Sequence, residues 1–165
     1  MKFLFIQFIG AIGYSLLAYS YFKEDKRQIL FMQIFAYLMF VIHYYLLSGI
    51  TGAICNLIGL FALLAIYILD KSKFKNIVAT FFIVELLLIN IYEFQNFFSI
   101  FPLVASISVI ISFLNNDEDV IRIIGIISAI CWLVYAVVYK SYIAIVFEVL
   151  TLIGTFYAYI KSKKI

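Results

Sequence analysis

The sequence carries few polar side chains inside its long apolar stretches, and five of them stand out: Glu148, Asn56, His43, Glu85 and Asn90. A charged side chain near the middle of a bilayer costs about 3 kcal/mol on insertion scales, so such residues are rare and commonly mark a solute or ion pathway. Carboxyl and amide groups bind polar solutes through hydrogen bonds, and a carboxylate also binds a cation or takes up a proton. These residues are therefore the first candidates for a binding site.

The spacing around two predicted turns brings four residues together. Glu148 lies eight residues after Lys140, at the centre of one turn, and Trp132 lies eight residues before it. At about 1.5 Å per residue, both side chains lie roughly 12 Å below the membrane surface on adjacent helices. Phe40 and Asn56 are also sixteen residues apart, around an earlier turn. We predict that Asn56 and Glu148 bind a small polar solute between the rings of Phe40 and Trp132.

Three further residues could control access to this site. His43 lies about one helical turn from Phe40 and is able to titrate near neutral pH, so it is a candidate gate or proton relay. Tyr135 lies three residues after Trp132, just as His43 lies three residues after Phe40, so it is a candidate for the same role. Glu85 is central in the fourth apolar stretch, where it could face a cavity, lipid or a second protomer.

Each of these residues also has a purely structural interpretation. Glu148 could be a neutral carboxyl group bonded to a backbone carbonyl or a tyrosine, and Asn56 could simply join helices. Trp132 could be a packing residue, and His43 an interhelical hydrogen-bonding residue. The thirteen tyrosines mostly fall near helix ends, where an aromatic belt at the membrane surface explains them.

The composition indicates that these residues are held in an all-α integral membrane protein. The chain of 165 residues is 67% hydrophobic and 13% charged, and its mean hydropathy is +1.14. This is more apolar surface than a protein of that length can bury in one core, so lipid must cover the rest. Because a membrane helix needs about 17 to 25 residues, we predict seven spans: 3–22, 29–47, 53–69, 76–92, 97–114, 120–139 and 142–160.

The charges of the connecting loops predict the orientation. Ten of the twelve Lys and Arg residues fall on one side of the predicted helices, and only Lys2 and Lys140 fall on the other. Cytoplasmic loops of membrane proteins carry the excess of Lys and Arg. We therefore predict an N-terminus outside and a C-terminus in the cytoplasm.

A shift of 92 residues superposes the first three spans on the last three. This register predicts one membrane domain, 1–165, built as 3+1+3: repeat one 1–72, a linker helix 76–92 and repeat two 93–165. The sequence identity between the halves is close to chance, so the repeat rests on the helix pattern. Gly10 and Pro102 correspond in this register, and because both residue types loosen helices we predict them as helix hinges.

An aromatic residue sixteen positions ahead of an Asn resembles the substrate pocket of the SWEET sugar transporters and the bacterial SemiSWEETs. The resemblance implies that Asn56 and Glu148 contact substrate and that Phe40 and Trp132 flank it. Glu148 departs from that pattern, which has a second Asn there, so a cationic or proton-coupled solute replaces a plain sugar as the expectation. The single proline also departs from a set of prolines that serve as hinges in SWEETs.

Three stretches resemble the YgjV-type bacterial inner-membrane proteins more closely: His43-Tyr44-Tyr45-Leu46-Leu47, Cys131-Trp132-Leu133-Val134 and Ser141 through Glu148. This likeness covers nearly the whole chain. It implies a SWEET-like fold of seven helices that pass repeatedly through the bacterial inner (plasma) membrane.

We predict a transporter that moves a small polar solute by alternating access, with a ligand-binding receptor or an assembly factor on the same fold as the alternative. No Ser/His/Asp set, HExxH pair or phosphate-binding glycine loop occurs in the sequence, so an enzyme is not expected. Cys55 and Cys131 lie in no metal-binding spacing, and neither a metal nor a cofactor is predicted. The expected partners are the solute and the lipid bilayer, not nucleic acid, and a homo-oligomer is left open.

Overall fold

Seven α-helices and one short 3-10 helix make up the described part of a computed structural model, which comprises residues 2–20, 26–69, 72–94, 96–114 and 118–162 and contains no β-strand there. The predicted all-α fold is confirmed, with helix ends within three residues of the predicted ones, apart from positions 21 and 22, which lie outside the described residues. In chain order the elements are α1 (Lys2–Ser20), α2 (Lys26–Leu46), α3 (Ile50–Leu69), α4 (Lys75–Tyr92), η1 (Phe97–Ser99), α5 (Ile100–Leu114), α6 (Glu118–Val138) and α7 (Tyr142–Ser162).

Three of these helices, α1, α3 and α4, are long and apolar enough to cross a membrane. The other four contain shorter apolar stretches within the described residues, namely Leu30–Leu46, Phe97–Ser112, Ile123–Val138 and Tyr142–Phe156. By length and composition, the predicted spanning character is therefore confirmed for three helices. Four of the cations behind the predicted orientation lie outside the described residues: Lys23, Lys71, Lys163 and Lys164.

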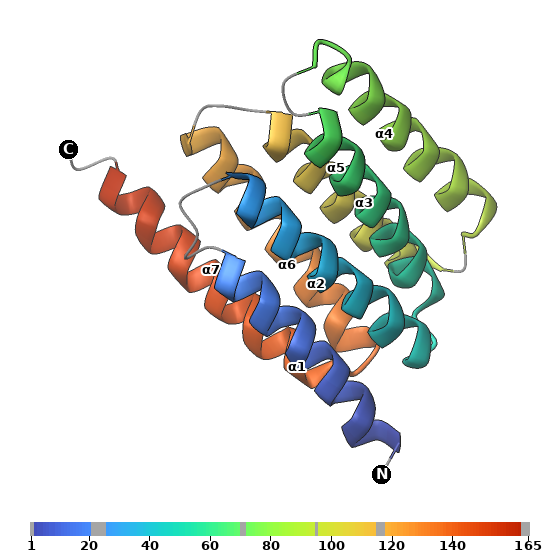
Figure 1. Ribbon diagram of the computed structural model, residues 1–165. Coiled ribbons are helices and arrows are strands. Elements are labelled where there is room, and N and C mark those ends of the chain that lie inside the picture. Colours follow the sequence, from blue (N-terminus) through green and yellow to red (C-terminus); the bar gives the residue numbers. More distant parts are fainter. Residues whose placement is uncertain (1, 21–25, 70–71, 95, 115–117, 163–165) are drawn as a thin grey trace.

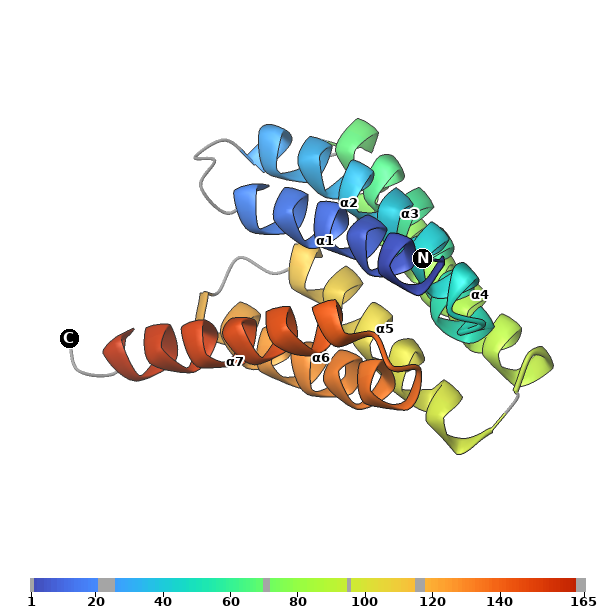
Figure 2. The ribbon, with the colours of Figure 1, turned by 90° about the horizontal axis from the view of Figure 1, so that it is seen from below.

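The helices form two layers, one of α1, α2 and α3 and the other of α5, α6 and α7 (Figure 1). Within each layer consecutive helices contact one another, and α4 contacts α3 and α5 at the edge. The layers meet where α1 contacts α7 and where α3 contacts α5. Figure 2 shows the layers diverging from the end that carries the N-terminus toward the end that carries the C-terminus. We call these the N-terminal end and the C-terminal end of the bundle.

The turns after α2 and α6 have the same backbone conformation. Ser48 (φ 61°) and Lys140 (φ 54°) are the two non-glycine residues with positive φ in the described chain, and they are 92 positions apart. In each turn the next amide donates to the carbonyl five residues earlier, at 2.8 Å in the first and 2.9 Å in the second. This is the Schellman ending of a helix, with the left-handed residue just beyond it. Each turn thus starts the following helix antiparallel to its predecessor.

Tyr135 of α6 joins the two layers at the N-terminal end. Its side chain is fully buried, and its hydroxyl accepts a hydrogen bond of 2.8 Å from the backbone N–H of Gly52 on α3. A Cβ atom at Gly52 would clash with the Tyr135 ring. The glycine therefore lets an aromatic ring from the other layer lie directly on the α3 backbone.

We expect Gly52→Ala to destabilise the protein by about 1 to 3 kcal/mol, because the added methyl group must displace the Tyr135 ring and weaken its hydrogen bond. The thermal midpoint of the detergent-purified variant should fall by several degrees. Gly154→Ala on α7 is the matched control, since among the described residues no atom outside its own helix backbone lies within 4 Å of its added Cβ. Equal midpoints for the two variants would contradict this packing.

Candidate functional site

The carboxyl group of Glu148 lies inside the bundle and bonds across the two layers. Glu148, on α7, is 7% exposed, and the Tyr14 hydroxyl on α1 donates to its Oε1 atom at 3.0 Å. The Tyr14 ring lies close to two phenylalanines, with centroid separations of 4.7 Å to Phe40 and 5.0 Å to Phe147, the latter stacked. The predicted site residues Glu148 and Phe40 are thus both neighbours of Tyr14.

Two glycines let α1 approach the other helices closely enough for this bond. A Cβ atom at Gly13 would lie 2.7 Å from Phe40 Cε1, and one at Gly10 would lie 2.7 Å from Ile143 Cγ2 and 2.8 Å from His43 Cε1. All three distances are far below van der Waals contact, so a side chain at either position would push α1 away. Helix α1 runs without a break through Gly10. Its role as a hinge stays a prediction, and close packing is the role that these contacts support.

His43 joins three helices at the N-terminal end of the bundle. Its side chain is fully buried, with Nδ1 2.8 Å from the Ile6 carbonyl oxygen on α1 and Nε2 2.6 Å from the Ser141 hydroxyl, at the start of α7. A carbonyl oxygen only accepts hydrogen bonds, so Nδ1 must carry the proton, and a neutral ring then accepts at Nε2 from Ser141. The hydrogen-bonding role considered for His43 is therefore present. Its role as a gate or relay stays a prediction.

Trp132 packs beside a tyrosine that the sequence analysis did not select. It is 9% exposed and stacks on Tyr44 of α2 at 5.5 Å between ring centroids, with an edge contact to Tyr135 at 6.1 Å. The Tyr44 hydroxyl is buried and has no hydrogen-bond partner of good geometry among the described residues. Trp132 thus belongs to an aromatic cluster with Tyr44 and Tyr135.

Asn56 is buried in α3 but bonds within its own helix. Its Nδ2 atom donates to the Gly52 carbonyl at 2.8 Å, and the residue is 2% exposed. No hydrogen bond joins Asn56 to Glu148 among the described residues. The structure therefore gathers Glu148 and Phe40 around Tyr14, and Trp132 around Tyr44, without a direct bond from Asn56 to this group.

The other predicted site residues lie away from this group. Glu85 is half-buried on α4, and the described residues offer it neither a hydrogen bond nor an ion pair. Pro102 is fully buried in the first turn of α5, where the missing N–H of proline costs no helical hydrogen bond. Its hinge role stays a prediction. No group of three metal-ligating side chains occurs among the residues searched.

The sequence analysis missed Tyr14, Tyr44 and Ser141, although one of them carries a signal. Tyr14 lies well inside α1, so an aromatic belt at helix ends does not explain it. Tyr44 lies in the last turn of α2, where such a belt does explain it, and only the structure shows that its side chain is buried. Ser141 has no such signal, because a serine in a turn is ordinary. Only the meeting of α2 with α7 gives it a partner in His43.

Residues 4–165 match the model of the family Imp-YgjV, which is described as a bacterial inner membrane protein. No curated protein and no solved structure matches the chain. The family match confirms the resemblance to YgjV-type proteins and the predicted location, whereas the comparisons add no support for the resemblance to sugar transporters. The chain belongs to the Imp-YgjV family of bacterial inner membrane proteins.

Proposed function

We propose that this protein is a membrane transporter that moves a small polar solute by alternating access. The solute would bind between α1–α3 and α5–α7, at Glu148 and Asn56 and beside the rings of Phe40 and Trp132. The observation that carries the proposal is the buried Glu148 carboxyl group, whose hydrogen bond reaches from α7 to Tyr14 on α1. A carboxyl group in an apolar bundle is costly to maintain and is most readily explained by function.

Two halves of like construction support a 3+1+3 transporter architecture. Helices α2 and α6 have equal lengths and are offset by 92 residues. The turns that follow them have the same backbone conformation. Carriers with parallel repeats place the substrate near the bilayer midplane at the interface of the repeats. The SWEET-like arrangement expected from the sequence is part of this proposal, with α4 as the linker helix and all seven helices crossing the membrane.

Cross-layer contacts at the N-terminal end come in corresponding pairs. One pair joins a middle helix to the start of the third helix of the other layer: His43 to Ser141 at 2.6 Å, and Tyr135 to Gly52 at 2.8 Å. The other pair involves α1 and η1, which directly precedes α5. Gln7 accepts from the Ile143 amide at 3.1 Å, and the hydroxyls of Ser99 and Thr51 are 3.2 Å apart. In this second pair both residues correspond by a shift of 92 in sequence; in the first pair His43 and Tyr135 do, whereas Ser141 corresponds to Gly49, three residues before Gly52. We call these four contacts the outer clasp.

The outer clasp supplies one of the two gates that alternating access requires. The layers diverge toward the C-terminal end (Figure 2), so the clasp would hold the protein closed on the outside. Each neutral hydrogen bond is worth about 1 kcal/mol net, so four of them can be exchanged for solute contacts without a large barrier. Opening the clasp while the other end closes would expose Glu148 to the outside.

Two hydrogen-bonding groups define the kind of solute that fits. Glu148 is satisfied by a single hydroxyl donor from Tyr14, and the buried hydroxyl of Tyr44 has no hydrogen-bond partner among the described residues. A solute with hydroxyl or ammonium donors could replace Tyr14 at the carboxylate and bond to Tyr44. A small polar solute that is cationic, or that moves with a proton, meets these requirements.

A ligand-binding receptor or an assembly factor is the second candidate. It is favoured by the dense packing of the site, since Glu148, Tyr14, Phe40 and Trp132 are all less than 10% exposed. A receptor would bind ligand at the same carboxyl group but carry no flux. An assembly factor would bind no solute at this position.

The transport site is tested with Glu148→Gln and Asn56→Ala in proteoliposomes, after a thermal-shift screen of polar solutes has identified one that stabilises the parent protein. We expect uptake of that solute to fall at least tenfold in Glu148→Gln, because the amide retains the shape of the side chain but can neither ionise nor take up and release a proton. A smaller loss is expected for Asn56→Ala. Asn76→Ala, at an exposed position on α4, is the control for an Asn substitution.

Three outcomes of this experiment are distinct. Uptake equal to the parent in both variants would refute the site assignment. Binding without uptake by the parent protein would favour the receptor, and a screen in which no solute binds would favour the assembly factor.

The proposed orientation predicts which side of the membrane two exposed lysines face. In a chain with Cys55 and Cys131 replaced by alanine, Lys140→Cys should react with a membrane-impermeant maleimide in intact spheroplasts. Lys73→Cys, at the opposite end of the bundle, should react only after the membrane is permeabilised. The reverse pattern would invert the topology.

A further inference from the structure

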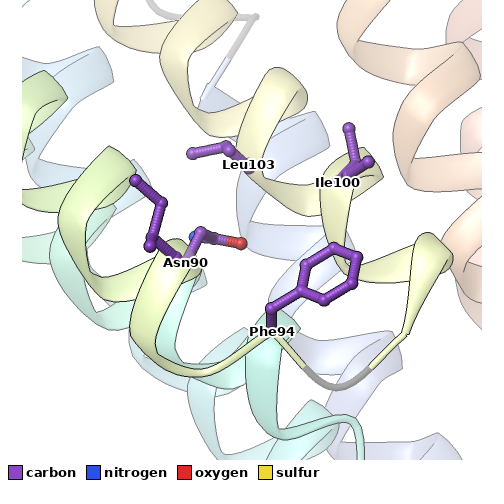
Figure 3. A pocket seen from close by; sticks show the side chains of 5 residues that line it. Asn90, Phe94, Ile100 and Leu103 are labelled. Atoms are coloured by element: carbon purple, nitrogen blue, oxygen red, sulfur yellow. The ribbon is translucent and has the colours of Figure 1, made fainter.

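A pocket of about 390 Å³ lies between the end of α4 and the start of α5, away from the proposed transport site (Figure 3). Its lining residues are Asn90, Ile91, Phe94, Ile100 and Leu103. Four of these side chains are apolar, so the pocket accommodates an apolar ligand segment. Asn90 is its one polar lining side chain.

The Asn90 amide presents its oxygen to the pocket. Its Nδ2 atom donates to the Leu86 carbonyl at 3.1 Å and lies 3.4 Å from Cys55 Sγ. Because the Leu86 carbonyl can only accept, this contact fixes the amide nitrogen on the helix side. The Oδ1 atom is buried without a partner among the described residues, in a side chain that is 5% exposed. Figure 3 shows that oxygen pointing into the pocket. A ligand must therefore bring a hydrogen-bond donor.

The pocket opens on the outer edge of the bundle, where a membrane protein meets lipid. Ile91 is 77% exposed and Phe94 is 57% exposed. Asn90 is two residues from Tyr92, the end of α4, so the donor would lie about 3 Å along the helix from that end. This places the donor near the membrane surface, where the head group of a lipid lies.

The local charges favour a positively charged donor. The last carbonyl groups of α4 form the negative end of a helix dipole, and the half-buried Glu93 is the residue that caps this helix. The sequence contains no Lys or Arg between Lys75 and Arg122. An anionic head group would find no cation in the α4–α5 hairpin, whereas an ammonium group would find an amide oxygen and a carboxylate.

We propose that the pocket is a binding site for a phospholipid with a primary ammonium head group, phosphatidylethanolamine. The ammonium group donates to Asn90 Oδ1 and lies near Glu93, and one acyl chain packs against Ile91, Ile100 and Leu103. Phosphatidylcholine carries the same charges but has no N–H donor on its head group. Phosphatidylglycerol has hydroxyl donors but adds a net negative charge.

Native mass spectrometry of the detergent-purified chain, titrated with each of these three lipids at identical acyl chains, tests the proposal. We expect phosphatidylethanolamine to bind at least about fivefold more tightly than the other two, because one charge-assisted hydrogen bond is worth about that factor or more. Asn90→Leu should weaken phosphatidylethanolamine binding about five- to tenfold and leave phosphatidylcholine unchanged. Asn76→Leu, the same substitution at an exposed position on α4, should have no effect.

Leu103→Trp is a second variant, which fills the pocket while Asn90 is retained and should lower the affinity for all three lipids. Retained helical circular dichroism identifies folded variants, and the lipid comparison on the parent chain does not depend on any variant. Equal binding of phosphatidylethanolamine and phosphatidylcholine, or tighter binding of phosphatidylglycerol, would overturn the proposal. So would a shift of the monomer–dimer ratio in Asn90→Leu with unchanged lipid binding, since a second copy of the chain would then cover the pocket.

Discussion

A carboxyl group inside a bundle of apolar helices needs a hydrogen-bond donor, and Glu148 on α7 obtains one from Tyr14 on α1. That bond requires the two layers to lie close together, which Gly10 allows where it meets Ile143 of α7, while Gly13 lets α1 pack closely on Phe40 of α2. Phe40 and Phe147 then pack against the Tyr14 ring and hold it beside the carboxyl group. The packing of α1 on α7 and the state of Glu148 thus depend on each other.

The hydrogen bonds of the outer clasp lie at the N-terminal end of the bundle because of the two turns there. There the Schellman turns at Ser48 and Lys140 bring the starts of α3 and α7 within reach of Tyr135 and His43 from the opposite layers. Toward the C-terminal end the layers diverge (Figure 2). In the proposed transporter, this difference between the two ends is what distinguishes the closed gate from the open one.

The helices could be predicted from sequence because each is a long apolar run that ends at a turn or a cluster of charges. Glu148 could be selected as a candidate for the same reason, since a carboxyl group is conspicuous in such a run. Its partner could not, because Tyr14 becomes a donor only when α1 crosses α7, and one tyrosine among thirteen carries little information by itself.

Two other expectations show where spacing stops being informative. Equal spacing around the two turns predicts that Asn56 and Glu148 converge on one site. The Asn56 amide instead donates to the Gly52 carbonyl of its own helix, and the side-chain conformation that makes this bond is not determined by the spacing. His43 is conspicuous in the sequence as a polar residue in an apolar run. Its bonds to Ile6 and Ser141, however, depend on how α1 and α7 pack against α2. Contacts between elements far apart in the chain are not encoded in the periodicity of either element.

The central claim is that the two layers separate at the outer clasp during function. The most direct measurement is the distribution of distances between spin labels at the exposed residues Ser48 and Lys140, in a chain with Cys55 and Cys131 replaced by alanine. The distances are measured by pulsed electron paramagnetic resonance in lipid nanodiscs. The account predicts a short and a longer population, with the longer one increased by Tyr135→Phe, which removes the bond to Gly52. A single narrow distance that is identical in the parent and in Tyr135→Phe would contradict it.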